Sequence, residues 1–359
     1  MTNNNNSPSP FKWMIYGANG YTGELIAREA VKRGLKPILA GRSLDKVQKL
    51  AQELGTEAVA FPLDNVADAA NNIRGCQLLL NCAGPFSATA EPMMNTCLQA
   101  KAHYLDITGE IAVFELAQSL KQQAETAGIV ICPGVGFDVI PTDCVAAALK
   151  EALPDATHLT LGFDSRSGFS PGTAKTSVEG LAQGGKIRRN GKIVSVPLAY
   201  QVRRIDFGDG EKLAMSIPWG DVSTAFHTTG IPNIEVFIPG SPGMIAGAKR
   251  ANYFRRLLGI RWVQNLVKAR IEKSVKGPSE SKRAVMPTHV WGEVTNARGE
   301  RKTARILTAN GYSLTITGSL AVVDFLQNNA VKGGAYTPAR LVGPQLVSQL
   351  PESGAMTIS

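Results

Sequence analysis

A glycine-rich turn near the start of the chain limits its possible folds more than any other segment. Residues 12–16 form an apolar run of strand length, and residues 21–34 repeat apolar side chains at helical spacing. Between them lies the sequence GANGYTG, whose GxxGxxG spacing is a variant of the dinucleotide-binding fingerprint. Such glycines allow a tight turn, a close approach of the backbone to a pyrophosphate, and close helix packing. We expect the pyrophosphate at the helix N-terminus, held by Gly17, Asn19, Gly20, Tyr21, Thr22 and Gly23.

After this turn, short apolar runs alternate with amphipathic stretches. The pattern predicts strands at residues 12–16, 37–40, 57–61, 77–82, 103–107 and 129–132. It predicts helices at residues 21–34, 43–54, 66–74, 92–100 and 111–127. Strands and helices that alternate in this way form a doubly wound parallel sheet, so we predict an α/β domain of Rossmann type over residues 11–145. Residues 1–10 are polar and of low complexity, which predicts a disordered tail.

The pattern changes after residue 143. A helix at residues 142–152 leads into longer strand-like stretches at 158–164, 192–197, 234–238, 288–296, 303–308 and 313–317. Asn190-Gly191 and Asn310-Gly311 are signals for tight turns between strands. We therefore expect a second, α+β domain with a mostly antiparallel sheet over residues 146–330. Its last helix, at residues 318–329, is expected to pack back on the first domain, and residues 331–359 form a C-terminal extension.

The end of the second expected strand indicates which dinucleotide binds. Sites for NAD usually place an acidic residue about 20 residues after the glycines, where it holds the ribose hydroxyls. Arg42 and Ser43 stand there in this chain, and a guanidinium with a hydroxyl suits the 2′-phosphate of NADP. We expect NADP(H) as the cofactor. An alternative role for Ser43 is to cap the helix that follows.

Two further loops are expected at the carboxyl edge of the sheet. Asp64 follows the third strand, where its carboxylate can accept from the adenine amino group or cap the next helix. Ala83, Gly84 and Pro85 follow the fourth strand, where the ribose next to the nicotinamide is expected to pass. A plain strand-to-helix turn is the alternative for these three residues.

Polar residues at the ends of the fifth and sixth strands are candidates for the chemistry. Reduction of a double bond needs a proton donor near the developing charge. We expect Tyr104 in this role, with Glu110 and Asp138 as residues that line the site. Alternation along the strand puts Tyr104 and Asp106 on one face. Tyr104 can instead pack with its hydroxyl bonded, and Asp106 and Asp138 can cap a turn or begin a helix. His227 can reach across from the second domain or be an ordinary strand histidine.

Composition excludes several classes of function. The five cysteines are odd in number and form no CxxC pair, so we expect reduced thiols and no metal site. No apolar run approaches the roughly 18 residues of a membrane-spanning helix, and the N-terminus does not resemble a signal peptide. The expected location is the cytoplasm, at most peripheral to a membrane. No Ser–His–Asp order, zinc motif or Walker loop supports a hydrolase or a kinase.

One segment accounts for the whole net charge of +9. Residues 249–283 contain 11 Lys or Arg and 2 Asp or Glu, with apolar residues at helical spacing between them. Such a basic amphipathic stretch can lie on an anionic membrane surface or dock an acidic acyl carrier. The alternative is a surface helix with a solvated basic face. Nucleic acid is not expected, because no aromatic groove or binding motif accompanies the charge.

Five segments in the first 145 residues resemble one family as a set. They are YGANGYTG (16–23), LAGRS (39–43), NCAGPF (81–86), YLDITGE (104–110) and PGVGFDVIPTD (133–143). Together they resemble the saccharopine dehydrogenase-like oxidoreductases, including the branch called trans-acting enoyl reductases. Agreement in the second domain is looser, through FDSRSGFSPGT (163–173) and FHTTGIPN (226–233).

The resemblance implies an NADP(H)-dependent oxidoreductase whose substrate domain helps to form a homodimer. Three functions remain open. The first is reduction of a lipid-like or acyl intermediate in lipid metabolism, in the manner of an enoyl reductase. The second is an oxidoreductase acting on a small amino-acid or imine adduct. The third is a dinucleotide- or lipid-surface-binding protein without turnover. An apolar site beside the nicotinamide favours the first, paired arginines the second, and the lack of a proton donor the third.

Overall fold

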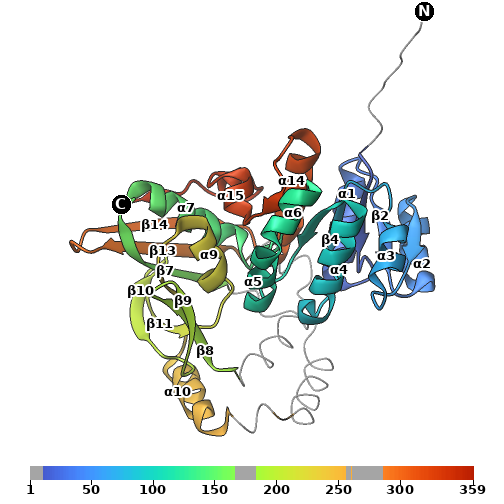
Figure 1. Ribbon diagram of the computed structural model, residues 1–359. Helices are drawn as coiled ribbons and strands as arrows, with labels where there is room; N and C mark the ends of the chain where they lie inside the picture. The colour runs from blue at the N-terminus through green and yellow to red at the C-terminus, as the bar shows by residue number, and fades with distance from the viewer. Residues whose placement is uncertain (1–10, 166–182, 256–259, 261–285) are drawn as a thin grey trace, which may run out of the picture.

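The computed structural model describes residues 11–165, 183–255, 260 and 286–359. Their strands gather into two sheets, here called sheet A and sheet B, which occupy opposite halves of the molecule (Figure 1). Sheet A carries the glycine-rich turn, and the strands of sheet B lie between residues 156 and 358.

Sheet A has the doubly wound order. Its strands are β1 (Trp13–Tyr16), β2 (Ile38–Gly41), β3 (Ala58–Ala60), β4 (Leu78–Asn81), β5 (His103–Asp106), β6 (Val130–Cys132) and β15 (Gly334–Ala335). They lie in the order β15-β6-β5-β4-β1-β2-β3, and all pairs are parallel. The order reverses between β1 and β4, and ligands of such sheets bind at the carboxyl ends of the strands at that point. The predicted Rossmann-type sheet is confirmed.

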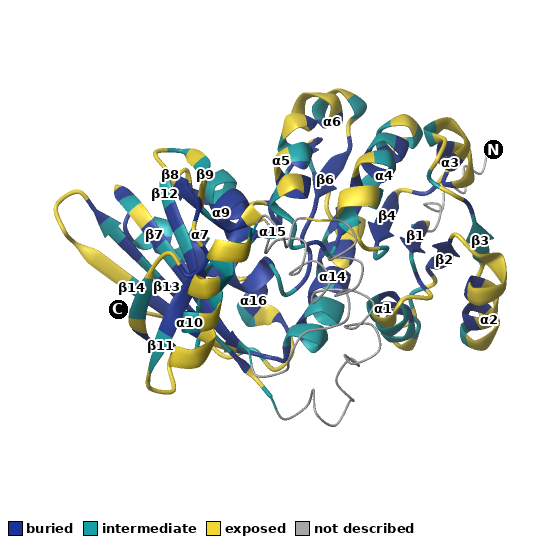
Figure 2. Ribbon diagram, turned by 90° about the horizontal axis from the view of Figure 1, so that it is seen from below, coloured by how far each residue is buried: buried dark blue, intermediate teal, exposed yellow. Residues whose placement is uncertain are grey.

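Helices cover both faces of sheet A. They are α1 (Tyr21–Lys32), α2 (Leu44–Leu54), α3 (Val66–Asn72), α4 (Phe86–Ala100), α5 (Ile111–Ser119) and α6 (Lys121–Ala127). Alternate residues of β1 point to opposite faces: Ile15 packs with α1 and α2, and Met14 packs with α3 and α4. Exposed residues lie on the outward sides of these helices (Figure 2). Two helix boundaries differ from the prediction, because α4 begins earlier, at Phe86, and the helix expected over 111–127 is interrupted at Leu120.

Sheet B is mostly antiparallel, as predicted. Its strands are β7 (Ala156–Ser165), β8 (Gly185–Arg189), β9 (Lys192–Val196), β10 (Val202–Asp206), β11 (Glu211–Ile217), β12 (Asn233–Pro239), β13 (Thr288–Asn296), β14 (Arg301–Thr308) and β16 (Thr357–Ile358). Among the described strand pairs of sheet B, only β12 and β7 are parallel. Two helices, α7 (Ile140–Ala152) and α9 (Asp221–Thr229), pack on this sheet and connect it to sheet A (Figure 1).

One expected strand is a helix. Residues 313–317 lie inside α14 (Gly311–Asn328), and the Asn310-Gly311 turn is the start of that helix, where Asn310 Oδ1 accepts from Tyr312 N (2.9 Å). The alternating β-branched residues favoured a strand, but packing of this segment against α1 decided its structure. Packing of the last long helix on the first domain is confirmed.

The C-terminal residues join the two sheets. After α14 the chain adds β15 to the edge of sheet A, forms α15 (Pro338–Val342) and α16 (Leu346–Gln349), and adds β16 to the edge of sheet B. His227, a possible strand residue in the prediction, lies in α9. Helix α10 (Pro242–Ala251) follows β12. No helix among the described residues is both long and apolar enough to cross a membrane.

Candidate dinucleotide site and domain junction

The glycine turn has the geometry of a phosphate-binding turn. Gly17 has φ +80°, and a Cβ there would lie 2.7 Å from Ala83 N, so the turn packs directly against the loop after β4. A Cβ on Gly23 would overlap the Gly17 carbonyl. Helix α1 begins with Gly20 in the cap position and no side-chain cap. The backbone N–H groups of its first turn, such as that of Thr22, therefore point to a place that suits a pyrophosphate.

Arg42 and Ser43 lie exposed where β2 ends and α2 begins. Within the described residues, the Arg42 guanidinium makes no hydrogen bond or ion pair with protein. The pKa of the Tyr16 hydroxyl is raised by burial, and the positive charge of Arg42 opposes this rise, which places Arg42 near the ends of the first strands. Ser43 occupies the N-cap position of α2, but its hydroxyl makes no cap hydrogen bond. The alternative role of Ser43 as a helix cap is therefore not fulfilled. Both side chains are available to a 2′-phosphate.

The other predicted contacts of the adenosine half also lie at this edge. A Cβ on Gly41 would lie 2.9 Å from Asn19 Oδ1, so the glycine gives the Asn19 side chain room over the end of β2. Asp64 is exposed after β3 and does not cap α3, because Asn65 Oδ1 accepts from Ala67 N (2.9 Å). The cap alternative for Asp64 is therefore wrong, and its contact with adenine stays a prediction.

The loop after β4 is fixed by hydrogen bonds at both ends. Ala83 N donates to Asn81 Oδ1 (3.0 Å), and Ala83 O accepts from Thr89 Oγ1 (2.6 Å). The peptide bond between Gly84 and Pro85 is cis. This loop is held against Gly17, as a wall beside the bound ribose requires.

Glu110 links two loops of the carboxyl edge. Its Oε1 accepts from Phe86 N (3.0 Å) at the start of α4, and its own N–H donates to Thr108 Oγ1 (3.0 Å). These contacts hold the loop after β4 against the loop after β5. Glu110 thus lies at the predicted edge and has a positioning role there.

Tyr104 lies below this edge and not in it. The side chain is fully buried between sheet A and its helices, and the hydroxyl donates to Asp106 Oδ2 (2.7 Å). Asp106 Oδ1 accepts from Thr108 N (3.0 Å) and Gly134 N (2.9 Å), so this carboxylate joins the loops after β5 and β6. Desolvation raises the pKa of Asp106 to about 6, although these hydrogen bonds oppose the rise. Tyr104 therefore has the alternative role, a packed side chain with its hydroxyl bonded. Its buried position does not support a role as proton donor.

Asp138 has the properties of an acid–base group. It is half-buried in the loop after β6, and a Cβ on Gly109 would lie 2.6 Å from its Oδ2, so the carboxyl lies on the loop after β5. Within the described residues its side chain has no hydrogen-bond partner. Burial raises the pKa of Asp138 to about 7, and a general acid works best when its pKa is near the working pH.

Aromatic side chains lie near the backbone of Asp138. Trp219 Nε1 donates to Asp138 O (2.9 Å), the rings of Trp219 and Phe163 are 4.9 Å apart, and those of Phe163 and Phe137 are 5.5 Å apart. No arginine of the described residues contributes to the pKa of Asp138. Among the described residues, the side chains that these contacts bring near Asp138 are therefore aromatic, and no pair of arginines that would bind carboxylates acts on its carboxyl.

An ion pair between a buried arginine and an exposed glutamate joins the two halves of the molecule. Arg188 of β8 is 5% exposed and donates to Val222 O (2.6 Å), Gly191 O (2.7 Å) and Glu115 Oε1 (3.0 Å). Its guanidinium also lies 4.1 Å from the centre of the Phe226 ring. Because Glu115 belongs to α5 and Arg188 to sheet B, this pair fixes how the helices of sheet A meet α9.

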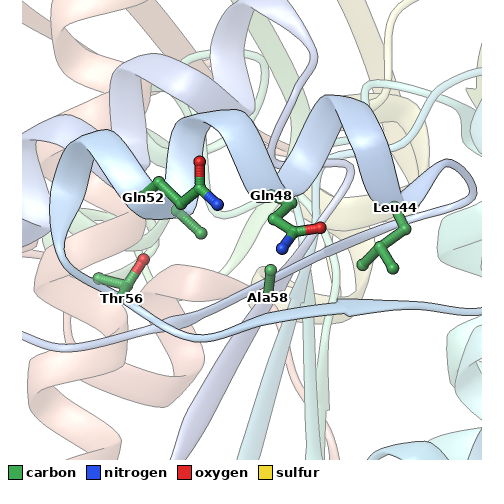
Figure 3. A pocket seen from close by; sticks show the side chains of 6 residues that line it. Leu44, Gln48, Gln52, Thr56 and Ala58 are labelled. Carbon is green, nitrogen blue, oxygen red and sulfur yellow. The ribbon is translucent and has the colours of Figure 1, made fainter.

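Some predicted features lie outside the described residues. Of the basic segment 249–283, only residues 249–255 and 260 are described, and there Tyr253 is 87% exposed. The motif at 163–173 is described only as far as Ser165. The five cysteines have free thiols. A hollow of about 290 Å³ lies under α2, lined by residues such as Gln48 and Gln52, and contains none of the predicted site residues (Figure 3).

Several site residues were missed by sequence reasoning. Trp219 and Asp221 lie in a stretch for which the sequence predicts no element, Arg188 belongs to no motif, and Phe137 lies in the motif 133–143 but is given no role by it. The position of Phe137 could have indicated its role, because it precedes Asp138 in the loop after the sixth strand, which must lie at the carboxyl edge of the sheet. No signal in the sequence brings residues 188 and 219 to that edge.

The fold and the glycine turn define a dinucleotide-binding domain of Rossmann type in the first part of the chain. Residues 13–132 match the family model described as the saccharopine dehydrogenase NADP binding domain. Residues 13–132 thus form a domain similar to the NADP-binding domain of saccharopine dehydrogenase, and the cofactor of this domain is NADP(H).

Individual relatives are similar over part of their length. The human saccharopine dehydrogenase-like oxidoreductase is 30% identical over 37% of this chain and 36% of its own. A protein of Mycobacterium tuberculosis provisionally named a trans-acting enoyl reductase is 30% identical over 49% of this chain and 45% of its own. The matches thus span less than half the length of these relatives. Saccharopine dehydrogenase (L-Glu forming) of Saccharomyces cerevisiae has the same fold, with a TM-score of 0.65, 11% identity, and coverage of 97% of this chain and 99% of that chain.

Proposed function

We propose that this protein is an NADPH-dependent reductase of an apolar, acyl-type substrate with a polarised double bond, in the manner of an enoyl reductase. The observation that carries the proposal is Asp138, a carboxyl with a pKa raised to about 7, beside the aromatic side chains of Trp219 and Phe163. The relative in M. tuberculosis, whose provisional name is trans-acting enoyl reductase, supports the same reaction class.

The chain's own residues divide the work between two regions. Arg42, Ser43 and the turn from Gly17 to Gly23 hold the phosphates, while the loop from Ala83 to Pro85 lies beside the ribose. Bound NADPH supplies a hydride to one carbon of the substrate double bond. Asp138 then gives its carboxyl proton to the neighbouring carbon and becomes a carboxylate, which balances the addition of two hydrogens. Glu110 and Asp106 keep the loops around Asp138 in place.

The apolar surroundings of Asp138 favour an acyl substrate over an amino-acid adduct. Carboxylates of an amino-acid adduct need cationic partners that are desolvated with them. The buried Arg188 already donates to three protein acceptors. An acyl chain gains from contact with Trp219 and Phe163 through burial of apolar surface alone.

Oxidation of NADPH by the purified protein tests this proposal with two probes. We expect a long-chain trans-2-enoyl thioester to be reduced faster than the imine formed by an amino acid and an aldehyde. Asp138→Asn should lower kcat about 10²–10⁴-fold, whereas Asp68→Asn on the exposed start of α3 should leave kcat unchanged. Faster reduction of the imine would favour the amino-acid alternative. Tight NADPH binding without turnover of either probe would favour a binding protein.

A contact with a lipid surface is a separate part of the proposal. Lys249 and Arg250 end helix α10, and the Tyr253 and Phe254 side chains that follow are exposed. Cationic and aromatic side chains together favour an anionic membrane surface. Sedimentation with phosphatidylserine vesicles should fall with Lys249→Glu/Arg250→Glu, and unchanged sedimentation would contradict this contact.

A further inference from the structure

The start of α14 is hydrogen-bonded to the loop that carries Asp138. Thr315 Oγ1 accepts from Phe137 N (3.0 Å), the residue directly before Asp138, across 178 residues of chain. The same hydroxyl donates to Gly311 O (2.8 Å) within its own helix. A hydroxyl donates one hydrogen bond and can accept others, so Thr315 satisfies both backbone groups at once. The loop after β6 is thus tied to α14 one residue before the proposed acid.

The loop and the helix pack so closely that each needs a glycine at the contact. A Cβ on Gly136 would lie 3.0 Å from Thr315 Cγ2, and a Cβ on Gly311 would lie 3.1 Å from ring atoms of Phe137. Neither glycine has a positive φ, so the need for glycine comes from space and not from backbone conformation. Because such a contact leaves no slack, the start of α14 determines where this loop lies.

The backbone around Asp138 is held from two elements. Thr315 of α14 accepts from the N–H of the preceding residue, and Trp219, just before α9, donates to Asp138 O (2.9 Å). The Asp138 carboxyl has no hydrogen-bond partner of its own among the described residues. Its position therefore depends on these two backbone contacts and on its packing against Gly109.

The start of α14 also contacts the glycine turn. The rings of Tyr312 and Tyr21 meet edge to face, with their centres 5.5 Å apart, and α14 packs on α1. Tyr21 is the first residue of α1 and follows Gly20 of the turn. The same short stretch of α14 therefore contacts both the turn where the pyrophosphate is expected and the loop that carries the proposed acid.

We propose that Thr315 is a positioning residue, which holds Asp138 in place relative to the dinucleotide turn by accepting from Phe137 N. Its hydroxyl is used by two backbone groups, so Thr315 gives no proton to the substrate. Proton transfer needs the acid within hydrogen-bond reach of the reacting carbon, and a small displacement of the loop takes Asp138 out of that reach. The role in turnover rests on the proposed function, whereas the anchoring of Phe137 does not.

Amide hydrogen exchange of the whole protein without substrate tests the anchor. In Thr315→Val the Phe137 N–H loses its acceptor and should exchange about tenfold faster, the equivalent of one hydrogen bond. Thr315→Ser keeps the hydroxyl and should keep the slow exchange. Thr317→Val is the matched control, because the Thr317 hydroxyl also donates to a carbonyl of its own helix, Ser313 O (3.0 Å). Unchanged exchange in Thr315→Val, or the same acceleration in Thr317→Val, would overturn the proposal.

Turnover of the enoyl thioester probe tests the positioning role. Thr315→Val should lower kcat about 10–100-fold and leave KM for NADPH unchanged, because a displacement of about 1 Å is enough for such a loss. Thr315→Ser should recover most of kcat, and Thr317→Val should keep it. Thr315→Ala favours the helix more than valine does and gives the same expectation if Thr315→Val does not fold.

Two kinetic results would contradict the positioning role. One is an unchanged kcat in Thr315→Val and Thr315→Ala, and the other is a raised KM for NADPH with kcat unchanged. If the unmodified protein fails to reduce the probe, the proposed function fails for that substrate class. The exchange rate of the Phe137 N–H then still decides whether Thr315 anchors the loop.

Discussion

Replacement of Tyr104 by Phe separates packing from proton donation. The substitution Tyr104→Phe removes one hydroxyl, which donates to Asp106 Oδ2 at 2.7 Å, and leaves the ring in the core. A hydrogen bond to a charged group contributes about 1.5–3 kcal/mol, and one to a neutral group about 1 kcal/mol. Because the pKa of Asp106 is about 6, Asp106 is ionised at pH 8 and mostly protonated at pH 5. The free energy of unfolding should therefore fall by about 2–3 kcal/mol at pH 8 and by about 1 kcal/mol at pH 5.

The sign of this pH dependence follows from the tyrosine's effect on the carboxylate. The hydroxyl favours the ionised form, so its loss raises the folded-state pKa of Asp106 further above the unfolded value. A raised pKa means that stability is present at low pH and lost as pH rises through the folded pKa. Urea unfolding at both pH values measures the difference. Tyr336→Phe is the matched control, because that hydroxyl donates to Lys332 O on the surface (2.9 Å).

Two results would refute this reasoning. One is an equal loss of stability at pH 5 and pH 8, which would mean that Asp106 is not the partner that matters. The other is unchanged stability together with a loss of NADPH oxidation of more than about hundredfold, which would make Tyr104 the proton donor.

The remaining predictions concern the turn and the junction. Gly17→Ala should abolish NADPH binding and destabilise the protein, because a Cβ would lie 2.7 Å from Ala83 N. Gly34→Ala, with the same φ of +80° and open space around it, should keep NADPH binding and lower the free energy of unfolding by only about 1 kcal/mol. Calorimetry and NADPH titration measure both variants, and equal effects would contradict the role of the close contact. Arg188→Met should lower the free energy of unfolding by about 1–3 kcal/mol, because the carbonyls of Val222 and Gly191 lose the donor that Arg188 supplies. Arg189→Met, next to it on the exposed side, should cost less than about 1 kcal/mol in the same urea titration, and a similar loss for both would show that the Arg188 side chain does not hold the junction.

The sequence predicts sheet A well because its signals are local. Each strand from β1 to β6 is a short apolar run, and each following helix has its own apolar period, so both faces of the sheet can be read from the chain. Gly17 and Arg42 are likewise found from spacing, since the turn and the end of β2 are fixed points of this fold. Ser43 and Asp64 show the limit of such reasoning, because neither forms the cap that its residue type favours.

Sheet B and the junction depend on contacts between distant residues. The segment 313–317 has the composition of a strand, yet it is helical because it packs between α1 and the loop after β6. The alternation of Tyr104 with Leu105 along β5 can be read from the sequence. Periodicity alone does not show that the Tyr104 side chain is buried below the carboxyl edge of the sheet. Trp219 and Arg188 reach Asp138 and Glu115 across 81 and 73 residues of chain, and no local pattern encodes such a pairing.

A titration with NADPH and NADH tests the central claim most directly: the 2′-phosphate is held by Arg42 at the end of β2. Intrinsic fluorescence should show NADPH binding more tightly than NADH by about 10–100-fold, the value of one or two charge-assisted hydrogen bonds. Arg42→Asp should reverse this preference, while Lys46→Asp, an equal charge change on the exposed side of α2, should keep it. NADH binding as tight as NADPH in the unmodified protein, or the same effect from both substitutions, would contradict the account.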